Sequence, residues 1–376
     1  MTPLTPGRYL VRLGVCVAVL LVLLIISPGI GTESASFGWW DAWRARLGLM
    51  IRADELSGRP LVDLDGDGVV SPDELVGFID VARQIGFGQR FARTLLALQV
   101  GVTLALCGAT FQVLFRNPLA TPYTLGIAAG GSLGALVAIR AGWTAVLLGL
   151  STVTISALAG GLLVVAAVFA VARGSRRLTS NELLLAGVTM GLFCSAMMML
   201  VQAVSNERET FSMVRWMMGS LDPLSTLQGA MILPVLVPAW VVLVLGGRVL
   251  NQYRLGDEMA ASRGVNVAAL QGGCVLICTL ATAVVVAKCG PIGFVGLVVP
   301  HVVSLLFGSD CRILLPASAV AGGAFLIVCD WGSQLTMRLG GWLTHRELGS
   351  ATLPIGVMTA IIGVPTFLVL LRTRRR

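Results

Sequence analysis

Residues 91–115 read FARTLLALQVGVTLALCGATFQVLF, and the chain continues from residue 116 as RNPLATP. Arg93 is the only charged residue in the first stretch, which is longer than the roughly 20 residues that a helix needs to cross a bilayer. Backbone polar groups inside lipid must bond within their own segment, so a helix is the only plausible form for such a run. Pro118 cannot continue a helical ladder. The stretch therefore predicts a membrane-spanning helix that ends in a proline-containing loop.

The rest of the chain repeats this pattern. Hydrophobic residues make up 56% of its 376 residues and charged residues 12%, and the mean hydropathy is +0.87. These values exclude a water-soluble domain and leave room for many crossings. We expect an all-α polytopic membrane protein with about ten transmembrane helices. Their approximate ranges are 9–28, 92–115, 120–139, 143–172, 181–204, 227–247, 267–288, 292–308, 313–332 and 355–371.

The distribution of arginines between the loops predicts how these helices are oriented. The loops on the side of the N-terminus hold most of the arginines near helix ends, for example Arg173, Arg176 and Arg177. Basic residues in short loops favour the cytoplasm, and an even number of crossings then places both termini there. The predicted divisions are a first transmembrane helix (1–31), an extracytoplasmic insert (32–88), and helices 2–10 (89–376) with a cytoplasmic loop at 248–266.

The insert gathers carboxylates in a chain that is otherwise poor in charge. Residues 63–74 read DLDGDGVVSPDE, which matches the twelve-residue calcium loop of an EF-hand, with a glycine at the sharp turn. The expected ligands are Asp63, Asp65, Asp67, the carbonyl of Val69, Ser71 and Glu74. Gly58 and Pro60 interrupt the helix that should precede the loop. We therefore expect a weak calcium site that acts as a structural clip, with a solvated Asp/Gly-rich turn as the alternative.

The sequence lacks the common catalytic motifs. It contains no GxxxxGK[ST] phosphate loop, no HExxH and no GxSxG, and its only histidines are His301 and His345. We therefore expect no nucleotide bound by this chain, no enzyme activity and no nucleic-acid partner. The eight cysteines have no metal-site spacing and mostly lie in apolar runs, which indicates small buried hydrophobes rather than a disulfide framework.

Six stretches, in order along the chain, carry a family resemblance. They are residues 91–135, RWMMGSL (215–221), LGDEMAASRGVN (255–266), GPIGFVGLVVPH (290–301), LLPASAVAGGAFLIVCD (314–330) and LPIGVMTAIIGVPTFLVLL (353–371). Together they resemble the FecCD or cobalamin-type family of ABC importer permeases, which carry iron-siderophores, haem and vitamin B12. The resemblance implies a homodimer in the inner (cytoplasmic) cell membrane, driven by two cytoplasmic ATPase subunits and supplied by an extracytoplasmic substrate-binding protein.

The resemblance also implies roles for particular residues. The loop at 248–266 would hold the coupling helix that meets the ATPase, through Gly256, Asp257, Glu258, Ala260 and Gly264. At the outer face, Arg90 and Arg93 match docking arginines of the family. Gln334 stands where a third arginine is usual, and Arg338 or Arg346 would replace it. Residues near the pathway and the dimer interface would be Gln112, Asn117, Pro118, Gly290, Gly293 and Gly296.

Each of these roles has a simpler alternative. The loop could be a solvated helix cap, the outer arginines could snorkel to the membrane interface, and the glycines could serve helix packing alone. For the whole chain, the alternatives are an ion-coupled secondary transporter and a calcium-responsive membrane sensor. The lack of paired intramembrane carboxylates disfavours the former. Co-purification with an ATPase subunit would separate an ABC permease from both.

Overall fold

The structure is a bundle of helices that also carries a short hairpin. The computed structural model describes residues 6–27, 90–147, 149–172, 180–221, 230–344 and 353–373. The helices are α1 (Pro6–Ile26), α4 (Phe91–Leu114), η4 (Pro122–Leu125), α5 (Ile127–Arg140), α6 (Thr152–Ala172), α7 (Ser180–Ala203), α8 (Glu207–Met217), α10 (Leu233–Leu245), α11 (Gly247–Tyr253), α12 (Asp257–Ser262), α13 (Val267–Cys289), α14 (Val295–Phe307), α15 (Cys311–Thr344) and α16 (Ile355–Thr373). The strands β1 (Val146–Leu147) and β2 (Leu150–Ser151) pair antiparallel.

Every stretch predicted as a membrane span contains a helix in the structure. The helices α4, α6, α7, α13 and α15 are each long and apolar enough to cross a membrane, and α10 with α11 would form one span bent by 52°. The apolar part of α1 and the helices α5, α14 and α16 are shorter. The described part of the chain is thus a multi-pass membrane bundle. The number of helices that cross the bilayer stays a prediction.

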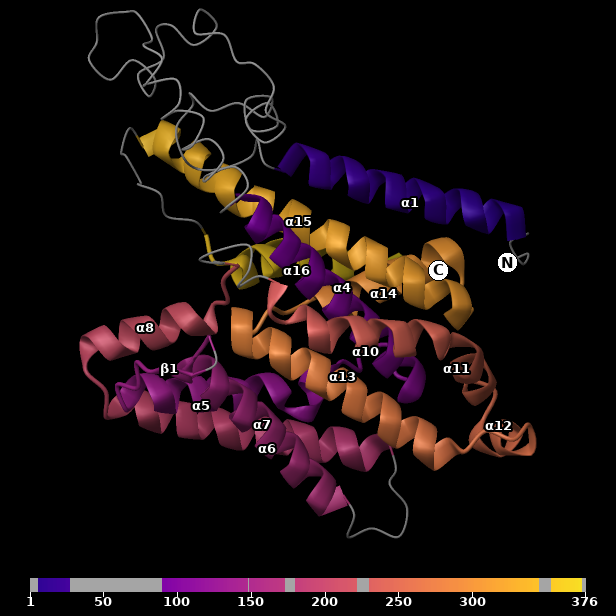
Figure 1. Ribbon diagram of the computed structural model, residues 1–376, viewed down its shortest axis with the longest axis horizontal. Helices are drawn as coiled ribbons and strands as arrows, with labels where there is room; N and C mark the ends of the chain where they lie inside the picture. Colours follow the sequence, from indigo (N-terminus) through magenta and orange to yellow (C-terminus); the bar gives the residue numbers. More distant parts are fainter. Residues whose placement is uncertain are drawn as a thin grey trace, which may run out of the picture.

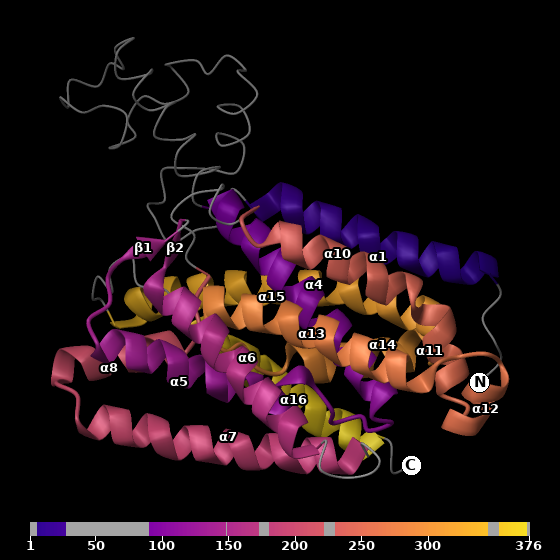
Figure 2. The same ribbon diagram turned by 60° about the horizontal axis from the view of Figure 1, so that its bottom comes forward.

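The helix α4 lies at the centre of the bundle, and 83% of an apolar 18-residue stretch of this helix is buried. It packs most extensively against α15, and Figures 1 and 2 show these two helices side by side. A Cβ atom on Gly101 of α4 would lie 2.2 Å from the carbonyl oxygen of Gly322 on α15, so the two backbones touch. Lipid provides no hydrophobic force between helices, and close packing of small residues therefore holds such a pair together.

The helix α5 begins at Ile127, later than the residue 120 expected from the sequence. The reason is the backbone between α4 and α5. Arg116 has a positive φ of 49°, and η4 is capped at its end by Gly126, whose φ is 81°. A left-handed conformation at these two points stops one helix and turns the chain before the next.

Two further elements depart from the predicted spans. The β1–β2 hairpin occupies the start of the span predicted at 143–172, so α6 begins only at Thr152. Helix α8 was not among the expected elements. It starts with a capping box, in which Asn206 accepts a hydrogen bond from the backbone N–H of Glu209 and the Glu209 side chain accepts one from Asn206. This Asn-x-x-Glu pattern is a helix-start signal that hydropathy alone does not reveal.

The bundle has two distinct ends. The start of α1, the end of α16 and the helix α12 lie toward one end, and α8 and the hairpin lie toward the other (Figures 1 and 2). The arginine distribution predicts that both termini and the loop at 248–266 lie on one side of the membrane. In the structure the start of α1, the end of α16 and α12 lie toward the same end of the bundle. Which end faces the cytoplasm stays a prediction.

Candidate functional site

The helix α12 is a short element set between two glycines. Gly256 caps its start with φ 122° and ψ 152°, and Gly264 follows its end with φ 83°. Residues with side chains rarely adopt these angles, so the glycines allow the chain to leave α11, form one short helix and turn into α13. The predicted coupling residues, Gly256, Asp257, Glu258, Ala260 and Gly264, therefore all lie in or directly beside α12.

Arg116 joins α12 to the end of α4. Its guanidinium lies 2.5 Å from the carboxylate of Asp257 and donates to the carbonyl oxygen of Tyr253 at 3.0 Å. The side chains of the ion pair are 46% and 53% exposed, so the pair orients the contact more than it stabilises it. Two motifs that are far apart in the sequence, RNP at 116–118 and the predicted coupling loop, thus meet at one junction.

Tyr253, at the end of α11, is the buried centre of this junction. Its side chain is 2% exposed, and its ring lies 4.8 Å from the guanidinium carbon of Arg116. The tyrosine hydroxyl donates to the carbonyl oxygen of Leu114 at 3.1 Å and accepts from the amide of Gln271 at 2.9 Å. One fully bonded side chain therefore sets the positions of α4, α11 and α13 relative to one another.

The opposite face of α12 is open. Met259 is 50% exposed and Leu255, just before the helix, is 59% exposed, whereas Ala260 is fully buried. Glu258 is also exposed. Because Asp257 is engaged by Arg116, a partner approaching α12 would meet Glu258 and the two apolar side chains. Apolar side chains beside a charged rim are typical of protein–protein contacts.

A second polar cluster lies near the other end of α4. The Nε atom of Arg93 lies 2.7 Å from Oδ1 of Asp330 on α15, and Oδ2 of Asp330 accepts from the amide of Gln334 at 2.9 Å. Asp330 is 2% exposed and Arg93 is 15% exposed. An arginine that the resemblance assigns to docking is therefore engaged inside the bundle. Gln334, which stands in place of another docking arginine, completes this cluster.

The other two predicted docking arginines are less fully described. Arg90 stands directly before α4 and is half-buried. Arg338 lies in the last part of α15, where the structure describes the helix but not the side chains.

Three of the predicted pathway residues, Gln112, Asn117 and Pro118, lie in the last turn of α4 or in the loop that follows it. The amide of Gln112 donates to the carbonyl oxygens of Gly296 at 3.3 Å and Leu297 at 3.2 Å, which joins α4 to α14. The side-chain oxygen of Asn117 accepts from the backbone N–H of Leu119 at 2.9 Å. Pro118 lies exposed between them. These contacts hold the turn after α4 in place.

The three predicted pathway glycines differ in their surroundings. A Cβ atom on Gly296 would lie 2.7 Å from the carbonyl oxygen of Leu104, and one on Gly290 would lie 2.5 Å from that of Trp216. Both glycines therefore allow a close backbone approach. A Cβ atom on Gly293 would meet no described residue within 4 Å, so packing among these residues gives no reason for a glycine there.

The predicted calcium ligands, Asp63, Asp65, Asp67, Val69, Ser71 and Glu74, lie outside the described residues. Within the ranges that the structure does describe, no three His, Cys, Asp or Glu side chains gather in a way that could hold a metal ion.

Sequence reasoning missed the side chains that connect these motifs. Asp330 carries a recognisable signal, because a carboxylate inside an apolar run needs a partner. Tyr253 carries none, because its partners are a backbone carbonyl and a glutamine on separate helices.

Comparison with known proteins supplies independent information. The model of the FecCD transport family matches residues 19–373. YvrB of Bacillus subtilis, an uncharacterised ABC transporter permease, is 35% identical over 288 residues, which are 76% of this chain and 78% of YvrB. The cobalamin import system permease BtuC of Halobacterium salinarum is 35% identical over 285 residues, 76% of this chain and 72% of BtuC. A solved transporter assigned to the metal-chelate type of ABC transporters, in an inward-facing conformation, has a TM-score of 0.74 at 27% identity and covers 96% of this chain and 99% of its own.

Proposed function

Since the chain belongs to the FecCD transport family and is a permease subunit of an ATP-binding-cassette importer, we propose that it carries a metal chelate or a corrinoid. The substrate class is that of an iron-siderophore, haem or cobalamin-type compound. The support is that one relative is named for cobalamin import and a similar solved structure for the metal-chelate type.

ATP hydrolysis takes place in separate partner subunits that bind at α12. The observation that carries this proposal is the construction of α12 itself. The helix is connected to the end of α4 through the ion pair of Arg116 and Asp257. Glu258, Met259 and Leu255 stay exposed. A short helix that is oriented on the bundle through Arg116 and buried Ala260, and is open elsewhere, suits the transfer of a partner's movement into the bundle. The end of the bundle that carries α12 would then face the cytoplasm.

The complete importer would contain two copies of this chain in the inner cell membrane, two ATPase subunits and an extracytoplasmic binding protein. Only 17% of an apolar 18-residue stretch of α7 is buried within one chain, so a wide face of this helix is available to lipid or to a second copy. We assign docking of the binding protein to Arg90 and Arg338, with Arg93 as the third residue that the resemblance suggests. The insert at 32–88 would lie beside this docking surface and would be held compact by calcium.

Reconstitution of the complete importer tests this proposal. The chain is co-expressed with its ATPase subunit, purified, and assayed in proteoliposomes for ATP-dependent uptake that requires the binding protein. Glu258→Arg should lower binding-protein-stimulated ATP hydrolysis and uptake together, because it places a repulsive charge on the open face of α12 without removing an internal contact. Glu207→Arg is the matched control. It reverses an exposed acidic residue on α8, toward the other end of the bundle.

Two results would contradict the proposal. The first is a permease that never co-purifies with an ATPase subunit and whose uptake collapses with an ionophore rather than with ATP removal, as an ion-coupled transporter would behave. The second is a Glu258→Arg variant that matches the Glu207→Arg control in ATP hydrolysis and uptake, which would remove the assignment of α12.

A further inference from the structure

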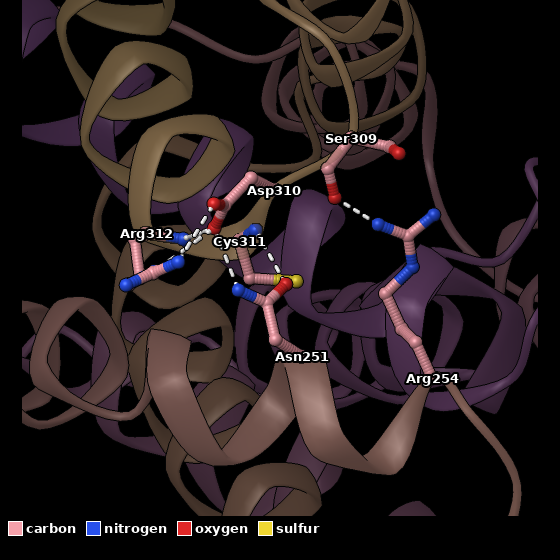
Figure 3. A network of polar contacts seen from close by, with 6 residues as sticks. All are labelled: Asn251, Arg254, Ser309, Asp310, Cys311 and Arg312. Carbon is pink, nitrogen blue, oxygen red and sulfur yellow. Dashed lines mark hydrogen bonds and ion pairs between the residues drawn. The ribbon is translucent and has the colours of Figure 1, made fainter. Parts of the chain in front are cut away.

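Asn251 of α11 forms two hydrogen bonds with the start of α15 (Figure 3). Its amide nitrogen donates to Oδ1 of Asp310 at 2.6 Å, and its amide oxygen accepts from the backbone N–H of Cys311 at 2.8 Å. Both bonds are part-buried and join residues about 60 positions apart in the sequence. An amide that donates and accepts at once fixes distance and direction together.

These bonds lie at the start of α15, where backbone N–H groups require acceptors from outside the helix. The first backbone N–H groups of a helix have no acceptor within the helix. Asp310, directly before α15, satisfies one of them, because its Oδ1 accepts from the N–H of Arg312 at 3.0 Å. Asn251 satisfies the N–H of Cys311 from a different helix. The start of α15 is therefore set partly by α11 and not only by its own sequence.

Other parts of α11 also contact the first turn of α15 and the residues just before it. Near its beginning, a Cβ atom on Gly247 would lie 3.0 Å from the carbonyl oxygen of Cys311, so the two backbones are close. Just after its end, the guanidinium of Arg254 donates to the carbonyl oxygen of Ser309, as Figure 3 also shows. The helix α11 thus contacts the start of α15 along its whole length, with Asn251 between these two points.

The same helix leads directly into α12, because only residues 254–256 separate them. From its start beside α11, the helix α15 continues to Asp330, which pairs with Arg93 near the other end of α4. A continuous series of contacts therefore connects α12 to the far end of the bundle. It passes through α11 and the hydrogen bonds of Asn251 into the long helix α15.

We propose that Asn251 is a positioning residue that carries a displacement of α12 into α15. This inference rests on the proposed function, because it concerns the step that follows binding of the ATPase at α12. Arg116 already connects α12 to α4. Asn251 supplies the second connection, so that α4 and α15, which touch along their length, move together with α12. Without it, α11 keeps only the close approach at Gly247 and the bond from Arg254 to Ser309, so the start of α15 should follow a displacement of α12 less closely.

The test measures coupling rather than activity alone, as the number of ATP molecules hydrolysed per substrate molecule imported in proteoliposomes of the complete importer. Asn251→Asp keeps the acceptor for Cys311 but faces Asp310 with a second carboxylate, so the bond to Asp310 is lost. We expect the ratio to rise about threefold or more, within the range by which coupling mutations act. The double variant Asn251→Asp with Asp310→Asn restores one carboxylate and one amide and should return the ratio to near the wild-type value.

Asn206→Asp is the matched control. It changes an asparagine that caps a helix within its own sequence, and aspartate caps equally well. A merely structural role for Asn251 would lower the amount of folded importer and leave the ratio unchanged, and that result would overturn the proposal. A ratio that stays high in the double variant would overturn it as well, because the effect would not come from this bond. If the wild type shows no ATP-dependent uptake, the proposed function itself fails and this inference fails with it.

Discussion

The pair of Arg93 and Asp330 separates two interpretations of the same arginine. If the pair is an internal clamp between α4 and α15, its removal should destabilise the fold. If Arg93 is a docking residue, its removal should weaken association with the binding protein and leave stability almost unchanged. The two substitutions to compare are Arg93→Ala and Asp330→Ala, each alone and both together.

The burial of the two side chains predicts an unequal cost. Arg93→Ala removes the charge-assisted bond to Oδ1 of Asp330, a carboxylate that is 2% exposed, whereas the bond from Gln334 remains. Loss of one partner of a buried pair costs about 3–5 kcal/mol, and we expect about 3 kcal/mol because this hydrogen bond remains. Asp330→Ala leaves an arginine that is 15% exposed and can extend toward water. We expect about 1.5–2 kcal/mol for this loss of a charge-assisted bond.

The double variant should be no less stable than Arg93→Ala alone, since it also removes the buried carboxylate that has lost its bond to Arg93. The assay is equilibrium unfolding of the purified permease in mixed micelles, with the association rate of the binding protein measured on the same samples. Arg140→Ala is the control. Its partner Glu209 lies 3.6 Å away in a pair that is 47% and 23% exposed, so the cost should be below about 1 kcal/mol. An Arg93→Ala variant as stable as Arg140→Ala, with slower binding-protein association, would refute the clamp.

Other variants test packing, docking, the insert and protonation. Gly108→Ala would place a Cβ atom 2.0 Å from the carbonyl oxygen of Gly296 and should cost about 1–3 kcal/mol in the same unfolding assay; an unchanged stability would show that α4 and α14 separate easily. Arg90→Glu should slow binding-protein association at low salt and less so at high salt, because exposed charges are screened within about 10 Å; equal rates at low salt would favour snorkelling. Glu74→Ala should abolish calcium-dependent protection of residues 32–88 from protease while uptake falls only modestly; protection that persists would remove the calcium site. Burial alone would raise the pKa of Asp310, but hydrogen bonds from Asn251 and Arg312 and the charge of Arg312 lower it below its ordinary value. The ionised form is therefore stabilised by folding, so the excess thermal stability of the wild type over Asp310→Asn should be full at pH 7 and shrink as the pH falls below about 4; a difference that grows on acidification would contradict this.

Local patterns in the sequence anticipated most of the helices, and they failed where the backbone leaves the regular path. Hydropathy predicted α4 and α13 to within about two residues. It placed the start of α5 too early, because apolar residues before Ile127 form η4 and a left-handed turn instead. It joined the β1–β2 hairpin to α6 for the same reason. Hydropathy reports whether a segment can lie in lipid, but not whether its backbone is helical at every residue.

The sequence by itself determined that this protein is a multi-pass helical membrane protein of the FecCD transport family. The helical membrane fold depends on the length of apolar segments, because a segment inside lipid must form a helix to bond its own backbone. The family depends on motifs in a fixed order, which can be identified from the sequence alone. Only the tertiary structure decided which side chains meet. Arg116 pairs with a residue 141 positions away, Arg93 with one 237 positions away, and Asn251 with one 59 positions away. No periodicity records such pairs, because they depend on how the helices pack and where each one begins. For this reason the sequence predicted a docking role for Arg93 but could not predict that this arginine pairs with Asp330 between two helices.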